Sequence, residues 1–154
     1  DVICLIRPRC RNWATPTRAL ADKPIEVAAG LVFRNGKLLI TKRPEGSHLA
    51  GLWEFPGGKR EANETIELCL HRELREELGI DVALGQALES VTHKYSVKTV
   101  QITFFLARLA KGEPRAIECT GLEWVTRENL AKFQFPPADQ RLISRLVDDP
   151  SFWE

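Results

Sequence analysis

The segment from Thr65 to Gly79 constrains the fold of this chain more than any other part of the sequence. Apolar residues recur in it at every fourth position, which is the spacing of a single stripe along an α-helix. They are Ile66, Leu70, Leu74 and Leu78. Thr65 is placed to cap the N-terminus of this helix, and Gly79 is placed to stop it. We therefore predict a helix over residues 65–78 that packs on a core through one face.

The predicted helix also carries acidic residues where apolar ones are expected. At roughly 100° per residue, Glu77 lies about 20° from Leu70, inside the apolar stripe, and Glu73 and Glu76 lie on its flank. A carboxylate near a core needs a cationic partner or a metal ion. Clustered carboxylate oxygens suit Mg²⁺ or Mn²⁺ rather than zinc. The pattern alone leaves open a metal site and a structural ion pair, such as Arg72 with Glu76.

The composition favours one compact globular domain. The chain has 154 residues, of which 44% are hydrophobic and 28% are charged, and its formal net charge is +1. No apolar run approaches the roughly 20 residues of a membrane helix. A nearly neutral chain has no strong field for nucleic acid or an anionic membrane. We expect a monomer that binds neither nucleic acid nor a membrane.

The cysteines and the first residue bear on the origin of the chain. The four cysteines form no CxxC pair and are too sparse for a disulfide framework, so we expect a reducing, cytoplasmic location. They are Cys4, Cys10, Cys69 and Cys119. The chain contains no methionine and starts at Asp1, so we expect a trimmed, processed or excised chain.

Strands are predicted on both sides of the helix. Two largely apolar runs, Ile25–Phe33 and Lys37–Lys42, flank Asn35-Gly36, a strong hairpin signal. The further elements that we predict are a short strand Leu52–Pro56 ended by Gly57-Gly58, strands Thr99–Leu109 and Gly121–Val125, a short helix from a Thr126 cap through Ala131, and a last helix Ala138–Val147 with Pro137 in its first turn. This order predicts an α/β domain over residues 25–150 with a mixed sheet between helices. Residues 1–24 are predicted to be an irregular leader or tail.

The region from Gly58 to Ile80 resembles the signature of the Nudix hydrolases. That signature is a Gly, five residues, a Glu, seven residues, and then Arg-Glu-aliphatic-x-Glu-Glu-x-Gly-aliphatic. Every specified residue is present at that spacing: Gly58, Glu64, Arg72, Glu73, Leu74, Glu76, Glu77, Gly79 and Ile80. The preceding residues 52–57 are similar to the MutT branch, and the similarity extends from about Val27 to about Leu146. It implies the Nudix fold, a mixed sheet sandwiched between helices in an α/β/α arrangement.

The resemblance also implies metal and diphosphate chemistry. The implied ligands of Mg²⁺, with Mn²⁺ as an alternative, are the carbonyl of Gly57 and the carboxylates of Glu73, Glu76, Glu77 and Glu118. Glu73 is a candidate base for the attacking water, and Arg72 and Glu64 would pair to hold the loop against the helix. Glu118 stands where the family places a further ligand or base, and its alternative role is that of an exposed loop glutamate. The metal would neutralise a triphosphate before an anionic hydroxide approaches phosphorus.

The implied substrate-binding residues lie on both sides of the signature. They are Arg43, Phe55, Gly58, Lys59, Phe135 and Asp139. Arg43 matches a basic position that contacts phosphate, and Lys98 is a second candidate. Phe55 and Phe135 are the preferred candidates for stacking on a base, ahead of Trp53 and Tyr95. A surface role for the cations and a core role for the aromatic residues remain the alternatives.

Asp139 bears on the identity of the base. Residues 135–139 resemble the MutT stretch that reads the base edge, but the enzyme specific for oxidised guanine nucleotides has Asn in place of Asp139. An ionised Asp only accepts hydrogen bonds, whereas a guanine edge offers two N–H donors and a carbonyl acceptor. A cytosine edge would require a protonated Asp. Relatives that hydrolyse modified cytidine triphosphates also have Asp here. The sequence leaves guanine and cytosine open.

The function that we expect is Mg²⁺-dependent hydrolysis of an oxidised or modified nucleoside triphosphate to monophosphate and pyrophosphate. The favoured substrate is 8-oxo-dGTP, with modified dCTP or CTP second, and the biological sense is sanitation of the nucleotide pool. The rival is a non-catalytic module that recognises 8-oxoguanine in DNA. Residues Cys4–Cys10 resemble the end of the iron–sulfur loop of MutY-type adenine glycosylases, which carry such a module, although two cysteines cannot hold a cluster. The complete carboxylate set and the neutral charge favour the enzyme.

Overall fold

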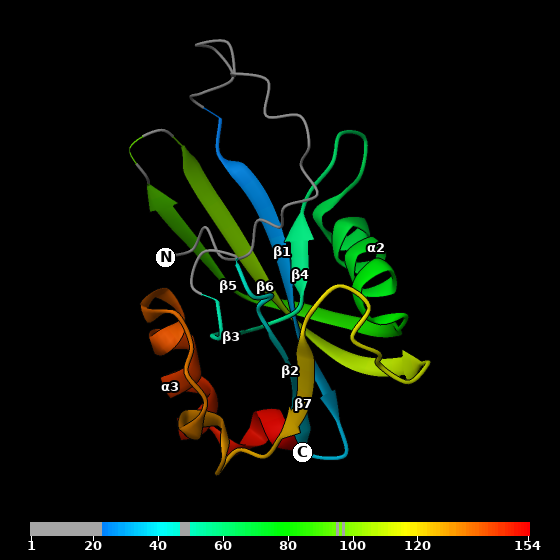
Figure 1. The fold of residues 1–154 in the computed structure, drawn as a ribbon, viewed down its shortest axis with the longest axis vertical. Helices are drawn as coiled ribbons and strands as arrows, with labels where there is room; N and C mark the ends of the chain where they lie inside the picture. The colour runs from blue at the N-terminus through cyan, green and yellow to red at the C-terminus, as the bar shows by residue number, and fades with distance from the viewer. Residues whose placement is uncertain (1–22, 47–49, 95, 97) are drawn as a thin grey trace.

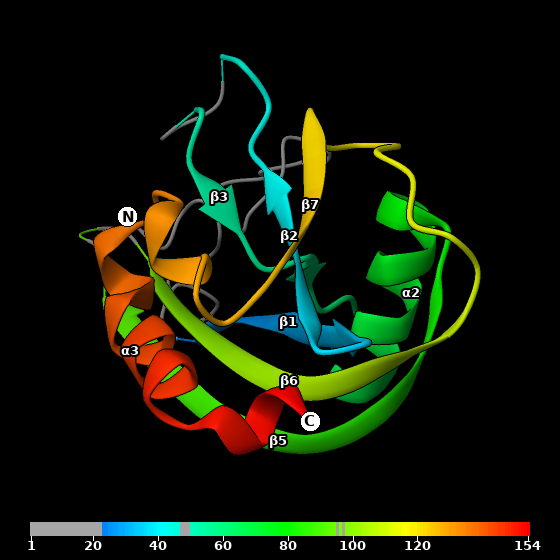
Figure 2. The ribbon, with the colours of Figure 1, turned by 90° about the horizontal axis from the view of Figure 1, so that it is seen from below.

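The computed structural model describes residues 23–46, 50–94, 96 and 98–154. Within them, a sheet lies between two α-helices, α2 (Ile66–Leu78) on one side and α3 (Gln140–Asp148) on the other (Figures 1 and 2). The predicted α/β class with a sheet between helices is therefore confirmed. The predictions made for residues 1–22, including the Cys4–Cys10 leader, and for Tyr95 lie outside the described residues.

The predicted hairpin forms between β1 (Ile25–Arg34) and β2 (Lys37–Lys42). The two strands are antiparallel, with Arg34 opposite Lys37. Asn35 and Gly36 have φ angles of 51° and 72°, as a two-residue hairpin turn requires. Asn and Gly adopt this conformation with the least strain, so the turn follows directly from the local sequence.

The remaining strands extend this hairpin into a mixed sheet. They are β3 (Trp53–Glu54), β4 (Gly57–Lys59), β5 (Asp81–Lys94), β6 (Thr99–Lys111) and β7 (Gly121–Val125). The main path runs β3-β2-β1-β6-β5, while β4 pairs with β1 and β7 pairs with β2. The pairing of β1 with β6 is parallel and the others are antiparallel.

The long edge strand β5 has no counterpart among the predicted elements. Val82 is its one buried residue and the others are exposed or half-buried, so no series of buried apolar positions marks this segment as a strand. The strand forms because its backbone pairs with β6 along most of its length, from Asp81 opposite Lys111 to Lys94 opposite Thr99. Its existence depends on a partner distant in sequence rather than on its own pattern.

Three further local predictions are wrong in detail. Gly57 and Gly58 do not end a strand but begin β4, where they lie opposite Ala29 and Ala28 of β1. The segment after Thr126 forms the 3-10 helix Leu130–Lys132 instead of a capped α-helix. The last helix is preceded by a separate 3-10 turn, Pro137–Asp139, so α3 starts at Gln140. The chain then ends in the 3-10 helix Pro150–Trp153.

Helix α2 has the caps and the buried stripe that its sequence predicts. The Thr65 hydroxyl accepts a hydrogen bond from the backbone N–H of Leu68 at 3.1 Å, and Gly79 takes a left-handed conformation with φ 69°. Its apolar residues pack on one face of the sheet, which we call the α2 face. A second cluster, which includes Phe55, Phe104 and Phe135, fills the opposite face under α3, which we call the α3 face.

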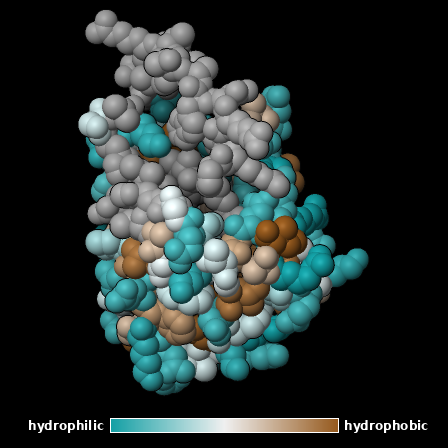
Figure 3. Space-filling model, in the orientation of Figure 1, coloured by the Kyte–Doolittle hydropathy of each residue, from teal (hydrophilic) through white to brown (hydrophobic). Residues whose placement is uncertain are grey.

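The surface of the molecule carries both hydrophobic and hydrophilic side chains. On the face drawn in Figure 3, hydrophobic side chains are interspersed with hydrophilic ones and form no continuous band. Among the described helices, none is long and apolar enough to cross a membrane.

Gly57→Ala is expected to lower the free energy of unfolding by roughly 1–3 kcal/mol. A Cβ at this position would overlap the carbonyl oxygen of Ala28 and the Cα of Ala29, which are backbone atoms of the paired strand. Urea unfolding measures the loss. Gly121→Ala is the matched control, because the nearest atom to its Cβ would be the Lys42 Cβ at 3.7 Å, an ordinary contact. Equal losses in the two variants would contradict this account of β4.

Candidate active site

The guanidinium of Arg72 is the hub of the candidate site. It binds the carboxylate of Glu64 with two hydrogen bonds, from Nε at 3.0 Å and from Nη2 at 2.7 Å. It also donates to the main-chain carbonyl of Lys59 at 3.0 Å. From its other side, Nη1 donates to Glu73 at 2.8 Å and to Glu76 at 3.3 Å. One arginine thus joins the loop before α2 to two carboxylates of the helix.

The hub keeps Glu64 ionised. Hydrogen bonding to Arg72 is the main cause that lowers the pKa of Glu64 from 4.5 to about 2. The carboxylate also accepts a hydrogen bond from the backbone N–H of Glu61 at 2.8 Å, which closes the turn of the loop. Bidentate pairing between Arg and a carboxylate is geometrically specific as well as strong. The predicted pairing of Arg72 with Glu64 is present in the structure, and it fixes the loop on the helix.

Gly58 allows β4 to approach α2 closely. A Cβ at this position would overlap the carboxylate of Glu73, so a larger residue would displace that carboxylate from its observed place. The thiol of Cys69, on the same helix, donates to the Gly58 carbonyl at 3.4 Å. Burial raises the pKa of this thiol to about 12, so Cys69 packs as a neutral group and is not a nucleophile. The close approach brings the loop glycines and the Glu73 carboxylate together.

Glu77 lies in the buried stripe of α2, as the helical spacing predicts. Its side chain is 0% exposed. The neighbouring Glu76 lies nearer solvent, with 40% of its side chain exposed. A fully buried carboxylate is rare in soluble proteins unless it is paired or coordinates a metal.

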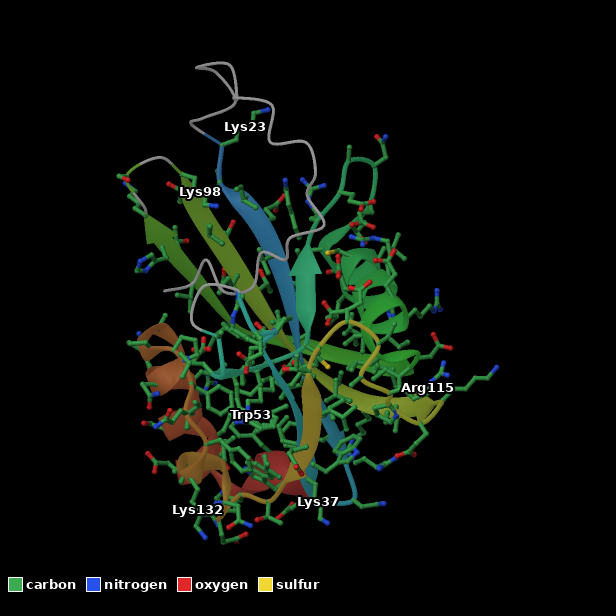
Figure 4. The ribbon with its side chains drawn as sticks, viewed as in Figure 1. Lys23, Lys37, Trp53, Lys98, Arg115 and Lys132 are labelled. Carbon is green, nitrogen blue, oxygen red and sulfur yellow. The ribbon has the colours of Figure 1, made fainter. Side chains whose placement is uncertain are left out.

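Glu118 is held close to this end of the helix by the backbone on either side of it. The N–H of Ile117 donates to the Glu77 carbonyl at 3.2 Å, and the N–H of Thr120 donates to the Lys42 carbonyl at 3.2 Å. The N–H of Arg115 also bonds the Leu78 carbonyl at 3.0 Å, and Figure 4 shows Arg115 beside this helix end. The segment with Glu118 therefore bridges the end of α2 and the end of β2.

The donor set fits a hard divalent cation. Glu73, Glu76, Glu77, Glu118 and the Gly57 carbonyl offer only oxygen atoms, which suits Mg²⁺ or Mn²⁺. Within the described residues, however, no three His, Cys, Asp or Glu side chains already converge on one point. Glu73 and Glu76 instead turn toward Arg72, which balances their charge. The structural ion pair and a metal site are thus compatible interpretations of the same carboxylates.

Arg43 does not lie on the open surface. It pairs with Glu54 at 3.0 Å, and each side chain is only 5% exposed. Glu54 is the residue of this region that the sequence interpretation missed. The alternation of Trp53, Glu54 and Phe55 could have revealed it, because a charged residue between two aromatic ones in a strand points to the opposite face. Lys98, the second cation considered for phosphate, lies just before β6 (Figure 4).

The candidate base-binding residues lie on the α3 face. The rings of Phe55 and Phe135 stack at a centroid distance of 5.1 Å, and Phe55 is 1% exposed. Trp53 meets Phe133 edge to face at 5.2 Å, among the side chains between α3 and the sheet (Figure 4). Each of these aromatic rings therefore has a packing role in the core beside any role in binding.

Asp139 is a buried titratable residue on this face. It is 7% exposed, and burial raises its pKa from 3.8 to about 7. No hydrogen bond or ion pair of its carboxyl group is found among the described residues, and no neighbouring charge contributes to the shift. A carboxyl group with this pKa is about half protonated near neutral pH. It then has one donor and one acceptor, as an Asn side chain has.

The structure thus divides the predicted site residues into two groups. The first group is joined by contacts at the loop and α2, and its members are Glu64, Arg72, Glu73, Glu76, Gly58 and Lys59. The backbone carbonyl of Glu77 accepts a hydrogen bond from Ile117, the residue before Glu118. Phe55, Phe135 and Asp139 lie toward the α3 face. The strand β3 runs between the groups, with Glu54 and Phe55 adjacent in the chain.

Comparison with known proteins finds relatives that match most of the chain. The NUDIX domain family model matches residues 28–145. The chain is 41% identical over 129 residues to the 8-oxo-dGTP diphosphatase of Haemophilus influenzae, covering 82% of this chain and 94% of that protein. It is 38% identical over 125 residues to the CTP pyrophosphohydrolase of Escherichia coli, covering 81% and 93%. The solution structure of the E. coli ORF135 protein superposes with a TM-score of 0.71 at 36% identity, covering 82% and 90%.

Glu64→Gln is expected to lower the free energy of unfolding at pH 7 by about 1–3 kcal/mol, because it removes a charged partner of Arg72. The folded-state pKa of Glu64 is depressed from 4.5 to about 2, so the stabilisation is present above pH 4.5 and is lost as the pH falls toward 2. The difference between wild type and variant in urea unfolding should shrink across this window. Glu61→Gln is the control, because this carboxylate is 69% exposed and 3.7 Å from Arg72. A difference independent of pH would contradict the assignment.

Proposed function

Since the chain belongs to the Nudix family and is a MutT-like nucleotide pyrophosphohydrolase, we propose that it hydrolyses oxidised or modified nucleoside triphosphates. The products are a nucleoside monophosphate and pyrophosphate. The favoured substrate is 8-oxo-dGTP, and the biological sense is sanitation of the nucleotide pool. The relatives reported above are a diphosphatase and a pyrophosphohydrolase, which favours this enzyme over a DNA-binding recognition module.

The Arg72 hub is the observation that carries the proposal. It holds the loop and Glu64 in place and keeps the carboxylates of Glu73 and Glu76 beside them. A module that only binds a base has no use for this arrangement, because like-charged glutamates on one helix face weaken the helix. An enzyme that acts on a diphosphate has a use for it, since these oxygens hold a cation that the substrate also binds.

Nudix enzymes are typically metal-dependent, and we propose Mg²⁺, with Mn²⁺ as a substitute. Its ligands would be the carbonyl of Gly57 and the carboxylates of Glu73, Glu76, Glu77 and Glu118. When bound, the cation would neutralise charge on the phosphate oxygens. The buried carboxylate of Glu77 and the close approach of Gly58 to Glu73 support this assignment.

The residues of the chain are proposed to activate the water and to hold the phosphates. Glu73 is proposed to accept a proton from the attacking water, with Glu118 as the second candidate. The oxygen of the water forms a bond to phosphorus, the bridging P–O bond of the anhydride breaks, and the leaving phosphate takes the electron pair. Arg72 and Glu64 position Glu73 and do not react. Arg43, with the Gly58–Lys59 loop, is proposed to contact the phosphates. We propose that the protein acts as a monomer.

Asp139 is proposed to read the base edge. In its protonated form it offers a donor to the carbonyl oxygen of guanine and an acceptor to the adjacent ring N–H, as an Asn would. The raised pKa supports this form, because burial disfavours the carboxylate. The same protonated group also complements the amino group and ring nitrogen of cytosine. A modified dCTP or CTP is therefore the second candidate substrate, as for the similar CTP pyrophosphohydrolase.

A hydrolysis panel of normal and oxidised nucleoside triphosphates with Mg²⁺ tests the proposal. We expect the highest kcat/KM for 8-oxo-dGTP, with monophosphate and pyrophosphate as products. Glu77→Gln should lower turnover by at least about 100-fold with an unchanged circular dichroism spectrum, because metal ligands and their supports are worth about this much. Glu67→Gln, in the exposed first turn of the same helix, is the matched control and should keep full activity. Inactivity on the whole panel, together with tight binding to DNA that contains 8-oxoguanine, would refute the enzyme assignment.

Asp139→Asn tests both the base reading and the pKa. The folded-state pKa of Asp139 is raised from 3.8 to about 7. The contribution of Asp139 to the free energy of unfolding of wild type is therefore highest below pH 4, where Asp139 is protonated, and falls as the pH rises toward 7. The variant should therefore exceed wild type in free energy of unfolding by roughly 1–3 kcal/mol at pH 8.5, and by less at pH 5. An ionised Asp139 can still accept from the two N–H groups of guanine but has no donor for the ring nitrogen of cytosine. The ratio of kcat/KM for guanine over cytosine substrates should therefore change with pH in wild type and be constant in the variant. An identical ratio in both proteins at every pH would exclude Asp139 as the base reader.

A further inference from the structure

Thr41, on strand β2, carries a buried hydroxyl group. Its side chain is 0% exposed, and its Oγ1 has no hydrogen-bond partner among the described residues. Nearly all buried polar groups in proteins have a partner. An unpaired hydroxyl in the interior destabilises the fold, and a valine would fill the same volume without that penalty.

The alternation along β2 places Thr41 on the face of the sheet that carries the carboxylates. Leu38 and Ile40 belong to the core under α3, whereas Leu39 belongs to the core under α2. Because successive side chains of a strand point to opposite faces, Thr41 shares the α2 face with Leu39. Its direct cross-strand neighbours are Glu54 on one side and Leu122 on the other.

The backbone brings the Glu118 segment next to this position. Residue 120 is bonded to the Lys42 carbonyl through its N–H at 3.2 Å and to the Arg43 carbonyl through its hydroxyl at 3.0 Å. These are the two residues that follow Thr41. Residue 117 is bonded to the carbonyl of Glu77. Glu118 thus lies in the short bridge between Glu77 and the end of β2, and one of its carboxylate oxygens, Oε1, is buried.

We propose that Thr41 is a positioning residue whose hydroxyl donates a hydrogen bond to the carboxylate of Glu118 when a divalent cation is bound. The inference rests on the proposed metal site. A carboxylate that binds a cation through one oxygen has its other oxygen available for a donor, and such outer donors orient the ligand. Thr41 is suited to this role because it is close in the fold, fully buried and has a donor to spare.

Mn²⁺ binding, followed by the electron paramagnetic resonance signal of the free ion, tests the proposal without turnover. Thr41→Val should weaken Mn²⁺ binding by about 10-fold, as loss of an outer hydrogen bond to a ligand does. Thr41→Ser keeps the hydroxyl and should bind as wild type does. Thr92→Val, the same change at an exposed position of β5, is the matched control and should have no effect. In the Glu118→Gln background, Thr41→Val should make no further difference.

Unfolding in urea with a chelator present provides the second measurement. Thr41→Val should leave the metal-free protein as stable as wild type or more stable, because it removes an unpaired polar group. A less stable Thr41→Val protein would show that the hydroxyl has a structural partner and would overturn the proposal. Wild-type affinity for Mn²⁺ in Thr41→Val, or a loss that persists beside Glu118→Gln, would overturn it as well. If wild type itself binds no Mn²⁺, the proposed metal site fails, and this inference fails with it.

Discussion

The guanidinium of Arg72 is the contact on which the candidate site depends. Its two hydrogen bonds to Glu64 and one to the Lys59 carbonyl attach an irregular loop to a regular helix. On its other side it balances the charge of Glu73 and Glu76. Without this guanidinium, three glutamates within five residues of one helix would repel one another, and Glu64 and the Lys59 carbonyl would lose their attachment to the helix.

Helix α2 itself is held by simpler forces. Its caps satisfy the terminal backbone groups, and its apolar stripe is buried against β1 and its neighbours. Gly58 then lets β4 approach the helix so closely that a methyl group would displace the Glu73 carboxylate. The apolar core therefore positions the helix, and the polar hub positions the loop on it. The apolar contacts and the Arg72 hydrogen bonds thus act on different sides of helix α2.

The surroundings of the carboxyl groups set their ionisation differently at the two ends of the site. At the α2 end, hydrogen bonding to Arg72 keeps Glu64 ionised, and the pKa of Glu64 falls to about 2. At the α3 end, Asp139 has no such partner among the described residues, and its pKa rises to about 7. Both groups are carboxylates in the same small domain. The difference follows from a neighbouring cation in one case and from desolvation alone in the other, and it suits phosphate chemistry at one end and a neutral base at the other.

The local sequence is sufficient for the elements whose pattern is self-contained. The Asn35-Gly36 hairpin, the capped helix α2 and the pairing of Arg72 with Glu64 all depend on residues close together in the chain or on one helical period. Strand β5 does not, because its residues are largely exposed and its partner β6 supplies the hydrogen bonds. The pairing of the two loop glycines with β1 likewise depends on a strand nearly thirty residues earlier.

The sequence by itself determined the signature, through its residue types and their spacing, and the buried position of Glu77, through the period of the helix. Only the tertiary structure decided the surroundings of the other site residues. It buried Arg43 against Glu54, stacked Phe55 on Phe135 and removed Asp139 from water. It also brought Glu118 to the end of α2 and left the Thr41 hydroxyl without a hydrogen-bond partner among the described residues. These outcomes depend on which strands meet, and hydrogen-bond satisfaction and desolvation are properties of the assembled core, not of any segment within it.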